Sequence, residues 1–179
     1  MKKQKGFSLI ELLIVVAIIL IIAAIAIPNL LRSKIAANEA SAVGSVRTIN
    51  TAEVTYSSTW GTGYATNLGN LGGGAGCVAS AATACLIDSL LSNGGAGNGG
   101  TKSGYTFQAG GTLLNAGINN GFQVNATPVA FQTSGVRSFC SDQSGVIKFA
   151  INGGTAIGIT NPSCDNVPPT AGVSGPVGN

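Results

Sequence analysis

The side chains best suited to chemistry in this sequence are its four cysteines, Cys77, Cys85, Cys140 and Cys164. An even set of cysteines, in a chain whose start is basic and then apolar, is typical of disulfide bonds formed in an oxidising compartment. We favour Cys77 with Cys85 and Cys140 with Cys164, because each bond then joins near neighbours, although spacing alone leaves all three pairings open. A metal site is the poorer interpretation, since the sequence has no histidine and no C-x-x-C motif.

Catalysis has few candidate residues. General acid–base chemistry needs a titratable group beside a nucleophile or an acceptor, and the commonest such group, histidine, is missing from the sequence. Asp88, Asp142 and Asp165 are far apart in the sequence, and Asp142, followed by Gln-Ser-Gly145, is better explained as a turn residue. The serines lack a G-x-S-x-G elbow and the glycine-rich runs lack a phosphate-binding motif. We therefore expect no enzyme, no catalytic residue, no metal site and no cofactor.

Charge does not favour nucleic acid as a partner. Three of the nine Lys and Arg residues lie within the first five positions, and the chain after residue 6 has six basic and six acidic side chains. The basic character is therefore confined to the first residues, and no basic patch remains for a phosphate backbone.

Glu11 is the carboxylate that stands at the start of a long apolar segment. The chain is apolar without a break from Leu12 to Ile27, and Phe7–Leu31, 25 residues, would form a helix of roughly 37 Å. That length spans a bilayer core of about 30 Å, and the preceding lysines favour a cytoplasmic N-terminus. A carboxylate in such a segment costs about 2.5–3.5 kcal/mol and is a functional candidate. The alternative is that Glu11 lies at the membrane interface and extends its carboxylate toward water.

The residues around Glu11 favour the functional interpretation. The run Lys5-Gly-Phe-Ser-Leu-Ile-Glu11-Leu-Leu resembles the cleavage and polymerisation motif of type IV pilins and type II secretion pseudopilins, and the resemblance extends over about the first 35 residues. It implies that a prepilin peptidase cuts between Gly6 and Phe7, that Phe7 is then N-methylated, and that Glu11 is needed for assembly. The new α-amino group at Phe7 is a cation that Glu11 can neutralise within the chain or on a neighbouring subunit.

A secretory signal peptide is the rival interpretation of the same segment. Ala24-Ile-Ala26 supplies a small-residue cleavage site, and cleavage there would release a soluble secreted binding protein. Against this, Glu11 interrupts the apolar core of such a signal, and the Gly6-Phe7 context would be a coincidence.

We expect an α+β fold, with a long N-terminal helix, half membrane-spanning and half amphipathic, packed on a small antiparallel β-sheet, which is the pilin fold that the resemblance implies. Helical spacing places Ala42, Val46, Ile49 and Tyr56 on one face of the second half, interrupted by Glu53. The expected segments are a leader peptide (1–6), a transmembrane and polymerisation helix (7–31), the amphipathic half of the helix (32–60), a glycine-rich loop region (61–104), the sheet domain (105–164) and an irregular tail (165–179).

Within these segments, local patterns predict smaller elements. Residues 79–91 read as a short helix. Short alternating runs separated by turn residues predict about four strands, with 129–131 less clear. The four runs are 105–107, 121–126, 137–140 and 146–149. Asn125-Ala-Thr127 is a sequon, which by itself is weak support for glycosylation.

The resemblance implies a structural subunit that polymerises through its N-terminal helix into a type IV pilus filament. Its implied partners are further copies of the chain, the prepilin peptidase, the assembly platform and the bacterial inner membrane, before the protein reaches the extracellular pilus. The alternative within the superfamily is a pseudopilin of a periplasmic type II secretion filament. Major pseudopilins carry a calcium site in the C-terminal region, toward which this chain offers only the carboxylates of Asp142 and Asp165.

Overall fold

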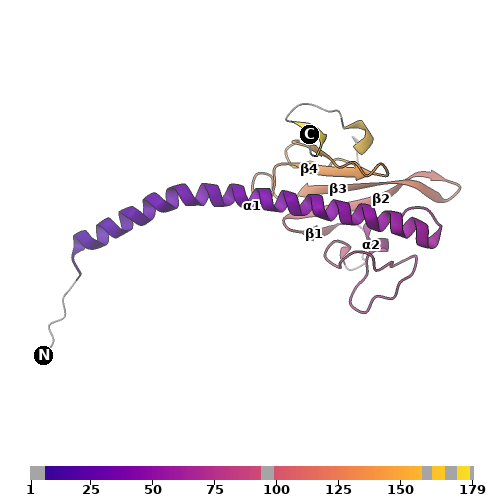
Figure 1. The fold of residues 1–179 in the computed structure, drawn as a ribbon, viewed down its shortest axis with the longest axis horizontal. Coiled ribbons are helices and arrows are strands. Elements are labelled where there is room, and N and C mark those ends of the chain that lie inside the picture. The colour runs from indigo at the N-terminus through magenta and orange to yellow at the C-terminus, as the bar shows by residue number, and fades with distance from the viewer. Residues whose placement is uncertain (1–6, 94–98, 159–162, 168–172, 178–179) are drawn as a thin grey trace. The chain divides into compact units, whose positions relative to one another are not determined.

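A computed structural model describes residues 7–93, 99–158, 163–167 and 173–177 (Figure 1). The chain divides into two compact units, one up to Lys34 and one from Ile35 onward. The leader peptide expected at residues 1–6, which includes Gly6, lies outside the described residues, as does most of the glycine-rich run 94–100.

One helix, α1 (Leu9–Trp60), contributes to both units. In the second unit its side chains follow the predicted stripe, because Ala42, Val46 and Ile49 are fully buried and Tyr56 is 6% exposed. Glu53, which interrupts the apolar stripe, is also fully buried. The stripe therefore packs in the core of the domain.

A six-stranded antiparallel sheet forms the rest of that unit, and its strands follow one another in chain order. The fold is thus α+β, with a long helix on a small antiparallel sheet, as predicted. The sheet has two more strands than the four expected, one at each edge, and the run at 129–131 is not a strand. The strands are β1 (Gly100–Lys102), β2 (Tyr105–Asn115), β3 (Ile118–Pro128), β4 (Ser138–Asp142), β5 (Lys148–Ala150) and β6 (Ser174–Pro176).

The central hairpin, β2–β3, is longer than its alternating runs predicted. Asn115 pairs with Ile118, so the turn between the strands has two residues. Both of them, Ala116 and Gly117, have positive φ angles of 50° and 83°. This is the type I′ geometry, whose twist matches that of the flanking strands. Because the turn fits the strands, they stay paired up to Asn115 and Ile118, beyond the predicted runs.

The two faces of the sheet have different coverings. Alternating residues of the hairpin, among them Phe107, Val124 and Phe122, join the stripe of α1 in the main hydrophobic core. A smaller core lies around Cys140, with Ala150, Ile157, Cys164 and Val167. The second core is built by the chain that follows β5, so the tail expected to be irregular contributes to the packing of the domain.

The tail also supplies an edge strand, which corrects the expectation of irregular structure over 165–179. Strand β6 pairs with β5 through Phe149 opposite Gly175, and a short 3-10 helix, η2 (Cys164–Asn166), precedes it. Backbone groups make this pairing, so a glycine- and proline-rich sequence can form it, and Pro176 at the outer edge needs no ladder N–H.

The helix predicted for residues 79–91 is wrong. Ser80 and Thr83 instead form an isolated antiparallel bridge, and Cys85 has a φ of 56°, which a helix does not accept. The helix in this part of the chain is α2 (Leu68–Leu71), capped by the side chain of Asn67. The backbone after the bridge forms hydrogen bonds with α2 instead of with its own next turn, so a helix does not form there. For example, Leu86 N–H donates to Leu71 O at 2.7 Å.

Candidate processing and assembly site

The start of α1 has a polar contact that bears on the predicted role of Glu11. The backbone N–H of Ser8 donates to Glu11 Oε2 at 2.9 Å, while Ser8 O accepts the N–H of Leu12 at 3.3 Å. Ser8 therefore occupies the N-cap position, and Glu11 binds the cap N–H as the acidic member of a capping box does. The carboxylate therefore lies beside the first turn of the helix, against Ser8, the residue that follows Phe7.

Phe7 and the apolar residues after it are solvent-exposed. The large apolar side chains from Phe7 to Leu31 range from 46% exposed at Val16 to 82% exposed at Phe7. Pro28 lies inside α1, and the helix continues on both sides of it. A helix that is apolar on every side needs an apolar environment, either lipid or other helices.

Length and composition make α1 suitable for crossing a membrane. It is the one helix among the described residues that passes this test, with a mean hydropathy of 3.3 in its best 18-residue window and none of that window buried. A cleaved signal sequence near an N-terminus has the same properties, so this feature alone does not separate the two interpretations.

In the second unit, Glu39 joins α1 to the loop before β4. Its Oε1 accepts the backbone N–H groups of Val136 at 2.9 Å and Arg137 at 3.1 Å. Its Oε2 forms an ion pair with Arg137, with Nε and Nη2 both at 2.7 Å. The Arg137 guanidinium also lies 5.5 Å from the ring centroids of Phe139 and Phe149. Sequence reasoning missed this pair, which joins residues 98 positions apart.

Glu53 is a buried carboxyl without an ionic partner. The backbone N–H of Ala65 donates to its Oε2 at 2.9 Å, and its Oε1 has no hydrogen-bond partner among the described residues. Burial raises the pKa of Glu53 to about 8, and the bond from Ala65 offsets only part of this effect. The carboxyl is therefore protonated at neutral pH and serves the fold as a neutral group.

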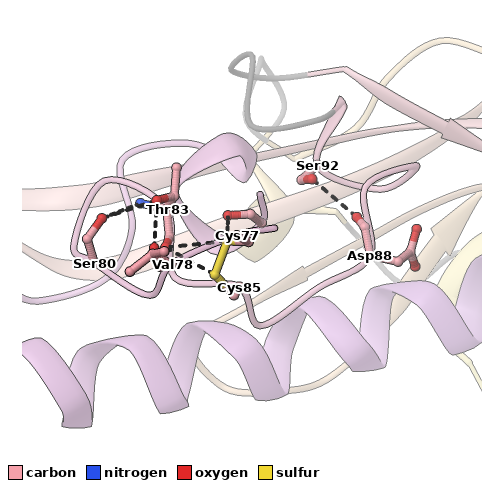
Figure 2. Close-up of a disulfide and its surroundings, with 8 residues drawn as sticks. Cys77, Val78, Ser80, Thr83, Cys85, Asp88 and Ser92 are labelled. Carbon is pink, nitrogen blue, oxygen red and sulfur yellow. Dashed lines mark hydrogen bonds between the residues drawn. A yellow bond between two sulfur atoms is a disulfide. The ribbon is translucent and has the colours of Figure 1, made fainter. Parts of the chain in front are cut away.

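The four cysteines form two disulfides, Cys77–Cys85 and Cys140–Cys164, which is the pairing favoured on sequence separation. Figure 2 shows the first bond inside a loop held by the Ser80–Thr83 contact. Tyr56 of α1 donates its hydroxyl to Ala81 O at 2.7 Å, which attaches this loop to the helix.

The end of the loop is fixed by Asp88, which Figure 2 shows hydrogen-bonded to Ser92. Its Oδ1 accepts the backbone N–H groups of Leu90 and Leu91, each at 3.0 Å, and its Oδ2 pairs with Lys102 Nζ at 2.8 Å. Burial acts to raise the pKa of Asp88, but these hydrogen bonds and the lysine charge hold it below its usual range. Asp88 thus acts as a turn cap.

Asp142 and Asp165, distant in the sequence, are brought together. Asp142 forms the predicted turn, with Ser144 N–H donating to Oδ1 at 2.8 Å and Gly145 N–H donating to its carbonyl at 2.9 Å. Burial opposes its ionisation, but hydrogen bonds from Ser144 and Asp165 lower its pKa, while the bond shared with Asp142 raises the pKa of Asp165. The described residues contain no group of three or more potential metal-binding side chains.

The sequon falls in the middle of a strand. Asn125 lies in β3, its side chain is 1% exposed, and its Nδ2 donates to Gln108 Oε1 at 3.4 Å. A buried amide on a paired strand does not offer an accessible acceptor in the folded domain, so the motif has a packing role here.

Comparison with known proteins gives similarity at the N-terminus and over a short alignment. Residues 1–27 match the family model of the prokaryotic N-terminal methylation motif. The chain is also 62% identical over 39 residues to a Thermus thermophilus protein described as the type IV wide pilus major component PilA4. That alignment spans 22% of this chain and only 30% of the relative. No solved structure matches the chain at a significant level.

The fold and the start of α1 are consistent with these similarities. A methylation motif leads into an exposed apolar helix, and the same helix packs on an antiparallel sheet in an α+β domain. At its N-terminus the chain is thus similar to proteins with the prokaryotic methylation motif and to a type IV pilus component.

Proposed function

We propose that this chain is a pilin, a structural subunit that polymerises through its N-terminal helix into a type IV pilus filament. In this proposal a prepilin peptidase cuts between Gly6 and Phe7, Phe7 is N-methylated, and the mature subunit leaves the inner membrane for an extracellular filament. The relative's description as a major component of a type IV wide pilus supports this direction.

The observation that carries the proposal is the exposed apolar surface of α1. Seventeen large apolar side chains between Phe7 and Leu31 are about half exposed or more. Burying one such side chain is worth roughly 1.5–3 kcal/mol in water, so this segment requires a permanent apolar environment. Lipid supplies it before assembly, and the packed helices of neighbouring subunits supply it in a filament.

Glu11 has a defined part in the proposal. An unpaired carboxylate inside a helix bundle is costly, whereas a carboxylate paired with the new α-amino group of Phe7 is neutralised. The Glu11 carboxylate accepts the N–H of Ser8, the residue that follows Phe7, whose nitrogen cleavage would turn into the new amine. The two groups can pair within one chain or between adjacent subunits. Neighbouring helices should then pack only in registers that keep this pair together, because any other register would bury an unpaired charge.

The test combines the mature N-terminus with two variants of Glu11. Mass spectrometry of the mature chain is expected to find N-methylated Phe7, whereas a chain starting at Ile27 would refute the pilin proposal in favour of a secreted soluble protein. Glu11→Ala is expected to abolish surface filaments, seen by electron microscopy, with membrane insertion intact. Glu11→Gln is the matched control for helix capping, since it keeps an acceptor for the Ser8 N–H and removes the charge.

The two variants separate charge from capping. Loss of filaments in both supports charge neutralisation, while filaments retained by Glu11→Gln alone would assign Glu11 to helix capping. Unchanged filaments in both would refute an assembly role. The pseudopilin alternative has less support, because only the neighbouring Asp142 and Asp165 carboxyls could contribute to its calcium site. Filaments confined to the periplasm and lost with a type II secretion system would support it.

A further inference from the structure

The face of the β2–β3 hairpin that is turned away from α1 carries an open cleft of about 310 Å³. Phe107, Val124 and their neighbours at alternate positions lie in the core with α1, so the intervening residues of both strands point to the opposite face. Small-molecule sites occupy roughly 300–1,000 Å³, and this cleft has the size of the smallest of them.

The floor of the cleft is a two-by-two array of neutral polar side chains. Thr106 is paired in register with Thr127, and Gln108 is paired with Asn125. Within the array, Asn125 Nδ2 donates a hydrogen bond to Gln108 Oε1 at a long 3.4 Å. Among the described residues, neither threonine hydroxyl has a hydrogen-bond partner. Asn125 is buried, whereas Thr106, Thr127 and Gln108 are half-buried, so the array presents two hydroxyl groups and the Gln108 amide to a ligand.

The walls of the cleft are apolar and small. Pro128, Val129 and Ala156 complete its lining. Phe131, 37% exposed, lies close to Pro128, since a Cβ placed on Gly154 would be 3.2 Å from Phe131 Cβ and 3.7 Å from Pro128 Cγ. Phe131 does not itself line the cleft, but it lies near Pro128, which does.

The wall at Ala156 is held in place by its neighbours. Thr155 O accepts hydrogen bonds from Ser138 Oγ at 2.8 Å and from Asn152 Nδ2 at 2.7 Å. Two residues later, Gly158 has a φ of 106°, and a Cβ there would be 3.3 Å from Val124 O. The chain therefore approaches β3 closely, and the cleft is formed before any ligand binds.

We propose that this cleft binds a neutral saccharide unit non-covalently. None of its lining side chains is charged, so it offers no ion pair to phosphates, carboxylates or amines. A sugar ring has hydroxyl groups at its edge for the threonine and amide array, and a C–H face for Pro128, Val129 and the nearby aromatic ring. The proposal depends on the sheet domain alone and does not require that the chain polymerise.

The experiment uses the full chain in zwitterionic detergent micelles, because sugar-based detergents would compete. The probes are the methyl glycosides of glucose, galactose and N-acetylglucosamine, together with maltose, lactose and chitobiose, at millimolar concentration. We expect at least one of them to shift the amide resonances of Thr106, Gln108 and Asn125 and to give a saturable titration. Each neutral hydrogen bond removed weakens binding by about fivefold, so Thr106→Val and Thr127→Val together should weaken it roughly 25-fold.

The matched control is Thr112→Val, a threonine of the same strand that does not line the cleft, and it is expected to leave the affinity unchanged. Ala156→Phe provides an independent test from the loop side, since its ring would fill the cleft and abolish binding. Three results would overturn the proposal: no shift with any saccharide, an affinity unaffected by the double valine variant and Ala156→Phe, or shifts at the same amides with an uncharged tetrapeptide and none with sugars.

Discussion

Glu53→Gln is the substitution whose consequence follows most directly from the structure. The carboxyl is fully buried, accepts one hydrogen bond from Ala65, and has a pKa raised by burial to about 8 from an ordinary 4.5. Between these two values the folded chain holds a proton that the unfolded chain releases. The free energy of unfolding therefore decreases as pH rises through this window, because the folded state binds more protons.

The magnitude comes from linkage. With these two values, the unfavourable contribution of Glu53 to stability is about 1 kcal/mol at pH 5 and about 4 kcal/mol at pH 8. The domain should thus lose roughly 3 kcal/mol of unfolding free energy over that range. Glutamine cannot ionise, so Glu53→Gln is expected to remove most of this slope, even if its buried amide hydrogens change the absolute stability.

Urea unfolding of the full chain in zwitterionic micelles, from pH 5 to pH 9, measures this slope. Trp60 is the one tryptophan in the sequence and lies 5.0 Å from the Tyr56 ring, so its fluorescence reports on the domain end of α1. The sequence has no histidine to titrate in the same range. Glu39→Gln, which replaces another buried glutamate of α1, serves as the control and should keep the slope.

The reasoning fails if the wild-type protein has the same unfolding free energy at pH 5 and pH 8. It also fails if Glu53→Gln retains the wild-type slope, because another group would then be responsible. A slope of the opposite sign would mean that the folded domain holds Glu53 ionised.

Two further predictions concern the C-terminal part of the domain. The Cys140–Cys164 bond closes a loop with a sequence separation of 24, so replacing both cysteines by serine should lower the free energy of unfolding by roughly 3–4 kcal/mol, measured by urea denaturation; a loss below 1 kcal/mol would contradict the chain-entropy argument. Asp165→Asn should raise the melting temperature at pH 7, because the contact with Asp142 raises the pKa of Asp165 and ionising it there is unfavourable. The gain should disappear at pH 3, where Asp165 is protonated in both the folded and the unfolded chain, and a lower melting temperature at pH 7 would show that Asp165 is stabilising as an anion.

Features encoded by local patterns were predictable from the sequence. The buried stripe of α1 follows from the helical spacing of Ala42, Val46 and Ile49, and the turn after Asp142 follows from its Ser and Gly neighbours. The capping contact of Glu11 also had a signal that was not used, since Ser8-x-x-Glu11 has the spacing of a capping box.

Features encoded by distant backbone pairing were not predictable. Strand β6 exists because the edge of β5 offers unpaired backbone groups, and Ile151 N–H donates to Val173 O at 2.7 Å just beyond the strands. No side-chain pattern in a glycine- and proline-rich tail records this. Likewise, the bond between Glu39 and Arg137 depends on how the sheet brings residue 137 to the helix, and neither residue type announces its partner.

The three glutamates of α1 show how one residue type takes different roles along a single helix. Glu11 caps the exposed first turn, Glu39 is ion-paired with Arg137, and Glu53 is buried with a raised pKa. In the proposed filament only Glu11 changes its surroundings on assembly, since the other two are already buried within the domain. A mature chain starting at Phe7 has six basic and six acidic side chains, so neighbouring subunits have no net charge to repel one another. The electrostatic cost of packing the helices then depends on Glu11 and the Phe7 amine, which is why the charge at Glu11, rather than overall charge, should control assembly.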